Sequence, residues 1–317
     1  MRKKGLLGCS FPVLIILLVA FLAILVLGFL SGGLLQNKYG PTWLHVPSPA
    51  PELPPEALFN IGSIPITNTI ITAWISILVI LVLSFLAFRR PKMVPTGLQK
   101  VVEWAYGSLL SFCESVAGEK NGRRFFPFVA TIFLFVITNA WLSLIPLYGN
   151  AIYVVVKGGA GPPLLRGANT DLNVTLAIAL FAFFSIEYFG FRELGFFHYM
   201  QKFVRLGKLK HGFVQLFTGK AKSAGGTLFF GFIDLAVGIL ETLSEFIRIV
   251  SFSFRLFGNM MAGEILLLVT AFLVPMVLAV PFYGLEFFFS FIQALIFGGL
   301  TLIFMTVAVT SHEEEHE

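Results

Sequence analysis

The sequence predicts an all-α polytopic membrane protein with five to six membrane segments. Hydrophobic residues make up 57% of its 317 residues and charged residues only 12%, and the mean hydropathy is +0.88. These values exclude an ordinary soluble domain. Apolar runs long enough to cross about 30 Å of hydrocarbon occur at residues 11–30, 70–88, 125–148, 172–191, 228–274 and 282–310.

The first run stands apart from the others. Arg2, Lys3 and Lys4 precede it and Ser31-Gly32-Gly33 follows it, so residues 1–35 are either an N-terminal transmembrane anchor or a signal segment that is removed. Residues 36–66 are rich in proline and are expected to form an extended outer loop. The membrane domain is then expected at 67–311, with a polar tail at 312–317.

The middle of the chain predicts two unusual elements. Residues 97–117 have mixed polarity and are expected to form an amphipathic helix on the inner membrane surface. The fifth run, 228–274, is more than twice as long as the roughly 20 residues that one span needs. It predicts a helix that is steeply tilted or lies against something large.

The basic residues predict the orientation of the chain. Of the 22 Lys and Arg residues, three lie at the N-terminus, seven between the second and third runs, and seven between the fourth and fifth. By the positive-inside rule these segments are cytoplasmic, and both termini are too if the first helix is retained. The net charge of +5 therefore reflects topology, and no nucleic-acid binding is expected.

A single arginine in the middle of the fifth run is the main functional candidate. Arg255 stays charged, and placing it at the centre of a membrane helix costs at least ~2.5 kcal/mol, so it needs an anion or water. Helical spacing places five further polar residues on its face, namely Glu241, Ser244, Arg248, Ser251 and Asn259. Interhelical hydrogen bonding could explain the serines, but not two arginines and a glutamate, which need water or a counter-charge from another chain.

A second polar face is expected between the last two runs. Glu264 follows Arg255 by nine residues and points about 180° away from it on an ideal helix. In the last run, Glu286, Ser290 and Gln293 share one face. Two carboxylates that face each other repel when both are charged, which predicts a proton relay between Glu264 and Glu286. A neutral structural carboxyl pair is the alternative.

These residues carry a resemblance to a known family. The segment Phe-Arg-Leu-Phe-Gly-Asn-Met-Met-Ala-Gly-Glu at 254–264 resembles the signature of subunit a of the F-type ATP synthase. The spacing of Glu241, the Asp-Leu-Asn-Val-Thr segment at 171–175 and the Phe-Ile-Gln-Ala-Leu-Ile-Phe segment at 291–297 resemble that family in the same order. The similarity covers about residues 60–311.

The resemblance implies a stator subunit that translocates protons and carries no catalytic residue, cofactor or metal. It implies a long tilted helical hairpin packed against a rotor ring, two aqueous half-channels, and Arg255 facing the carboxylate of the ring between them. It assigns Asn259, Glu264, Glu286 and Gln293 to the outer path, and Glu241, Ser244, Arg248 and Ser251 to the cytoplasmic side. The implied partners are the c-subunit ring, the b-subunit stator stalk, the remaining ATP synthase subunits and the lipid bilayer of a bacterial plasma membrane.

One position departs from the family pattern. Many bacterial members have histidine where this chain has Glu286, and all five histidines here lie outside the apolar runs. An imidazole relay is therefore not expected. The path is rich in carboxylates, which favours H⁺ over Na⁺ as the coupling ion.

Two other functions are alternatives for a polytopic membrane protein with these motifs. A secondary ion-coupled transporter would show inverted repeats or paired broken helices, and neither is visible in the sequence. The segment His-Glu-Glu-Glu-His at 312–316 satisfies a zinc-protease pattern. It stands in a polar tail without a third ligand, so an intramembrane protease is the weaker alternative.

Overall fold

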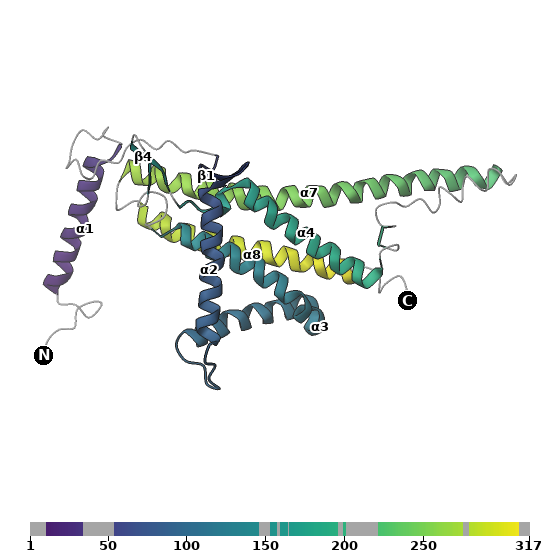
Figure 1. The fold of residues 1–317 in the computed structure, drawn as a ribbon, viewed down its shortest axis with the longest axis horizontal. Helices are drawn as coiled ribbons and strands as arrows, with labels where there is room; N and C mark the ends of the chain where they lie inside the picture. Colours follow the sequence, from purple (N-terminus) through teal and green to yellow (C-terminus); the bar gives the residue numbers. More distant parts are fainter. Residues whose placement is uncertain are drawn as a thin grey trace.

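The computed structural model describes residues 11–33, 54–145, 153–156, 159–163, 165–195, 199–200, 221–274 and 279–310. Five described helices are long and apolar enough to cross a membrane (Figure 1). They are α2 (Asn68–Phe88), α3 (Leu98–Ser143), α4 (Leu172–Leu194), α7 (Ala221–Leu273) and α8 (Ala279–Thr310). The expected all-α polytopic fold is confirmed. Helix α1 (Phe11–Ser31) adds a shorter apolar stretch at Leu18–Leu30.

Side-chain caps define where two of the membrane helices begin. Thr67 caps α2 by accepting a hydrogen bond from the Ile70 amide at 3.4 Å. Asp171 caps α4 by accepting one from the Asn173 amide at 2.9 Å. Each cap satisfies a backbone donor that the first turn of a helix leaves without a partner.

Helix α3 contains the predicted amphipathic segment and the third apolar run, joined at a corner. The corner lies at Gly118, whose φ of 77° and ψ of 161° are not helical. Figure 1 shows the helix turning sharply back on itself there. The amphipathic segment is thus confirmed as a helix, while its place on the membrane surface stays a prediction.

The core of the bundle forms where α3, α4, α7 and α8 meet. Small residues of α4, Ala179 and Ala182, let the helices approach closely. Phe252, Leu256 and Met260 of α7 pack in this core. Their burial fixes the rotation of α7 about its own axis, and so decides which of its residues point away from the bundle.

Helices α7 and α8 are the longest straight elements, and they lie side by side. With 53 residues, α7 is about 80 Å long at 1.5 Å per residue. In Figure 1 its N-terminal half extends beyond the bundle, while α2 crosses α7 and α8 steeply. If α2 stands upright in the membrane, the α7 and α8 pair is strongly tilted, as the length of the fifth run predicted.

Two short hairpins lie between the helices. Strands β1 (Ala57–Ile61) and β2 (Ile64–Thr67) pair across Gly62, whose φ is 65°. Strands β3 (Tyr153–Val156) and β4 (Gly159–Pro163) form the second hairpin. The first one occupies the end of the expected loop at 36–66. Residues 1–10 lie outside the described part of the chain. Most of that loop, at 34–53, and the polar tail, within 311–317, lie outside it as well.

Candidate functional site

Arg255 lies near the middle of α7, on a side that the described residues leave open. Its side chain is exposed, and its Nη2 donates a hydrogen bond to Ser251 Oγ, one turn earlier, at 3.4 Å. Phe254 is 56% exposed, and a Cβ placed at Gly258 would meet no atom within 4 Å. A charged side chain on an apolar helix therefore faces outward from the bundle, where only another molecule or water can compensate its charge.

A buried polar face on α8 lies across from the next turn of α7. Glu286, Ser290 and Gln293 are all buried, as their spacing predicted. The Asn259 amide nitrogen of α7 donates to Gln293 Oε1 at 3.4 Å. Among the described residues, Ser290 Oγ and Gln293 Nε2 have no hydrogen-bond partner. Buried polar atoms of this kind are satisfied by water in most proteins, so this face can hold an aqueous path.

Glu286 lies directly against the backbone of α7. A Cβ added at Gly263 would collide with both carboxyl oxygens of Glu286. Glycine at this position leaves the space that the carboxyl occupies. The Glu286 carboxyl is therefore held beside the residue that precedes Glu264.

Glu264 has a partner that the sequence analysis did not include. Arg166 Nε lies 3.3 Å from Glu264 Oε1 and 3.4 Å from Oε2. Arg166 is only 8% exposed, although its position in the sequence suggested an outer loop. The one signal that could have singled it out is an isolated cation just ahead of the start of a helix.

Arg248 does not share the open face with Arg255. Its Nη1 lies 2.6 Å from Glu245 Oε2, and its Cζ lies 3.8 Å from the centroid of the Phe304 ring of α8. Glu245 is buried and was not among the predicted residues, although it stands three residues before Arg248 and so one helical turn away. Of the other two candidates on this half of the helix, Ser244 is exposed and Glu241 is half-buried.

A further buried polar group lies near Glu245. Glu187 of α4 and Tyr199 are both buried, and the Tyr199 phenol lies against the Glu187 carboxyl. Burial, then the negative charge and hydrogen bonding of Glu187, raise the pKa of Tyr199, and the charge of Glu245 adds to this. These residues link α4 to α7, and Glu245 lies on the other side of Arg255 from Glu264 along α7.

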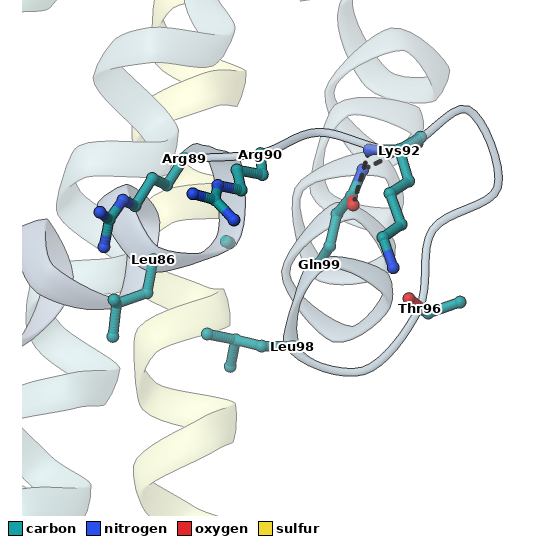
Figure 2. Close-up of a pocket in the computed structure, with 8 residues that line it drawn as sticks. Leu86, Arg89, Arg90, Lys92, Thr96, Leu98 and Gln99 are labelled. Atoms are coloured by element: carbon teal, nitrogen blue, oxygen red, sulfur yellow. Dashed lines mark hydrogen bonds between the residues drawn. The ribbon is translucent and has the colours of Figure 1, made fainter.

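A basic pocket of about 400 Å³ lies at the turn between α2 and α3 (Figure 2). Arg89, Arg90 and Lys92 line it. Gln99 fixes the turn, because its amide pairs with both the N–H and the C=O of Lys92, each at 3.1 Å. The pocket contains none of the predicted site residues, so the candidate path follows the faces of α7 and α8 instead.

Comparison with known proteins decides the family. The family model described as ATP synthase A chain matches residues 70–306. The chain belongs to this family. An ATP synthase subunit a from Gloeobacter violaceus is 34% identical over 249 residues, which cover 78% of this chain and 86% of that protein. Another, from Moorella thermoacetica, is 28% identical over 258 residues, covering 81% of this chain and 98% of that protein.

Membership of the family confirms the function that the resemblance implied. The chain is a multi-pass membrane subunit of an ATP synthase, with the role of stator and proton channel. In the described part of the chain, no group of three or more His, Cys, Asp or Glu residues could hold a metal ion. The zinc-protease segment at 312–316 lies outside that part, and the comparisons support neither it nor the secondary transporter.

Proposed function

We propose that the open face of α7 around Arg255 packs against a ring of c subunits, and that Arg255 acts on the carboxylate of each c subunit as it passes. The observation that carries this proposal is an exposed arginine in the middle of a long apolar helix. A rotor carboxylate would provide the anion that Arg255 needs in the membrane. The open surface at Gly258 gives the ring room to approach closely.

The polar residues on either side of Arg255 supply the two half-channels. Asn259, Glu264, Glu286 and Gln293 lead protons from the outer side to the ring, and Glu241, Ser244 and Ser251 lead them to the cytoplasm. Arg248 belongs to the cytoplasmic side as well, with its charge compensated by Glu245. One charge that crosses 100 mV releases about 2.3 kcal/mol, and this work turns the ring only if protons cannot pass straight across. The fixed charge of Arg255 blocks that direct route.

Lipid and the stator stalk cover other surfaces of the chain. Large apolar side chains of α2, such as Trp74, Leu78 and Phe85, are more than half exposed, which suits contact with lipid or with a transmembrane helix of the b subunit. The cations at the turn between α2 and α3 favour a cytoplasmic position for this turn by the positive-inside rule. The bacterial sources of the relatives support the plasma membrane of a bacterium, where the remaining ATP synthase subunits would complete the assembly.

The role of Arg255 is tested in the whole complex, reconstituted in liposomes. Arg255→Ala removes the separating charge and should abolish both ATP synthesis and ATP-driven proton pumping, while the complex still assembles. Arg255→Lys should fail as well, because a lysine can lose its proton when it is buried and lacks the planar fork of arginine. The exposed Arg192 provides the matched control, since Arg192→Gln removes one charge elsewhere and should leave both activities intact. Normal proton pumping in either Arg255 variant would refute the proposal.

A further inference from the structure

Arg166 extends from outside the helices into the outer half of the predicted path. Besides its ion pair with Glu264, its Nη1 donates to the Pro54 carbonyl at 3.2 Å and its Nη2 to the Met261 sulfur at 3.4 Å. Pro54 lies just before β1, and Met261 lies three residues before Glu264 on α7. The guanidinium is thus held from two sides while one edge faces the carboxylate.

The turn that carries Arg166 is itself fixed in place. It leads into a short helix, η4 (Ala168–Thr170), whose residues are all buried. The Ala168 amide donates to Asn139 Oδ1 of α3 at 3.1 Å, and the Asn169 side chain donates to the Val136 carbonyl at 3.1 Å. The Thr69 hydroxyl of α2 donates to Asp171 Oδ2 at 2.8 Å. Arg166 is therefore positioned by α2 and α3, unlike a mobile arginine of a surface loop.

The two acids of the outer path consequently have different surroundings. Glu264 has Arg166 beside it, whereas no described cation lies within ion-pair distance of Glu286, which is only 8% exposed. Of the other charged groups on adjoining segments, Asp171 caps α4 and binds Thr69, and Glu56 stands next to β1. An ionised carboxyl is favoured by a cation within about 4 to 6 Å. A carboxyl that is buried without a cation is costly to ionise.

We propose that Arg166 is the fixed counter-ion of Glu264 and that it thereby leaves Glu286 as the group that carries protons in the outer path. Arg166 acts as a positioning residue: it holds the Glu264 carboxylate in place. Glu286 passes its proton along the face formed with Ser290 and Gln293. This inference rests on the proposed outer path and assigns different roles to its two acids.

The first test measures ATP synthesis against the pH of the outer compartment, at a fixed membrane potential, in the reconstituted complex. Arg166→Gln removes the cation beside Glu264, so the dependence of synthesis on the outer pH should shift. Arg166→Lys keeps the charge and should shift the profile less. In a Glu264→Gln background, Arg166→Gln should cause no further shift, because the group on which it acts is gone. The exposed ion pair of Arg123 and Glu114 provides the control, and Arg123→Gln should leave the profile unchanged.

A second test holds even if Arg166→Gln alone prevents assembly. The double variant Arg166→Gln/Glu264→Gln removes both charges and leaves no buried ion without a partner. Glu286→Gln should lower synthesis at least tenfold more than this double variant does. Equal losses in the two variants, or an equal pH shift with and without Glu264, would overturn the inference. Wild-type synthesis in both Glu286→Gln and the double variant would overturn the inference and would also refute the proposed outer path. The rotor contact is tested separately, by the Arg255 variants.

Discussion

Two arginines on α7, seven residues apart, have their charges compensated in different ways. Arg248 has a carboxylate at 2.6 Å and an aromatic ring against its guanidinium, all from this chain. Within the described part of the chain, the polar contact of Arg255 is a serine hydroxyl at 3.4 Å. An arginine whose charge is compensated internally can serve packing, but one that faces outward in the membrane depends on a partner. The difference supports the proposal that Arg255 is the residue of α7 that acts on another molecule.

The close packing of the Glu286 carboxyl on Gly263 can be tested by a single substitution. Gly263→Ala places a methyl group where the Glu286 carboxyl lies, so Glu286 must move or α7 and α8 must separate. The clash is with the end of a flexible side chain, so the loss of stability should be small, but ATP synthesis should fall several-fold because the carboxyl is displaced. Synthesis in liposomes and the thermal midpoint of the purified complex measure the two effects.

Gly284 of α8 is the control for this substitution, because a Cβ there meets no atom within 4 Å. Gly284→Ala should keep synthesis and should not lower the thermal midpoint. If Gly263→Ala behaved like Gly284→Ala, the close packing of Glu286 on α7 would be wrong.

Helical spacing predicted the residues that lie near one another on one helix, and missed those that meet across the fold. The stripe around Arg255 and the buried face at Glu286, Ser290 and Gln293 follow from 3.6 residues per turn. The pair of Arg166 and Glu264 joins residues 98 positions apart, and no local pattern encodes such a distance. Arg248 fell on the predicted stripe, but a long side chain can turn from its own face toward a neighbouring acid and ring.

Among the elements, α3 shows how one residue sets the arrangement of a helix. A continuous helix would carry the amphipathic arm straight on from the membrane arm, and the break at Gly118 lets the two arms take different directions. Composition predicted both arms, but not that one glycine joins them. The first hairpin was missed for a related reason: proline argued against a strand, yet Pro65 lies in a two-stranded sheet where every strand is an edge.

The corner of α3 can be tested by restricting its backbone. Gly118 has a positive φ that side chains other than glycine rarely adopt, so Gly118→Ala should cost about 1–3 kcal/mol. The thermal midpoint of the complex in detergent should fall. Gly107 lies in the same arm with helical geometry and open space around it, so Gly107→Ala should raise stability by about 0.5–1 kcal/mol. If Gly118→Ala and Gly107→Ala changed the thermal midpoint equally, a side chain at residue 118 would not strain the corner.

On the scale of the whole molecule, the open surfaces explain why the chain works only within an assembly. Large apolar side chains line the extended half of α7, among them Phe229, Phe230, Leu240 and Phe246. The bundle fixes one side of α7 and leaves the other to a neighbour. In the proposed mechanism, two half-channels that end at that open side cannot conduct across the membrane by themselves, because a ring has to carry each proton from one to the other.

The direction of the whole path depends on which side of the membrane each end faces, and cysteine labelling tests this. Met93 lies on the turn between α2 and α3 and is fully exposed, and Asn60 is exposed on β1. In a Cys9→Ser background, where the remaining Cys113 is buried, an impermeant maleimide should label Met93→Cys only in inverted vesicles. It should label Asn60→Cys only in right-side-out vesicles, because the positive-inside rule predicts a cytoplasmic basic turn and the hairpin lies at the other end of α2. The reverse pattern would place the ion pair of Arg166 and Glu264 on the cytoplasmic side, and Glu286 would then serve proton release to the cytoplasm instead of uptake from outside.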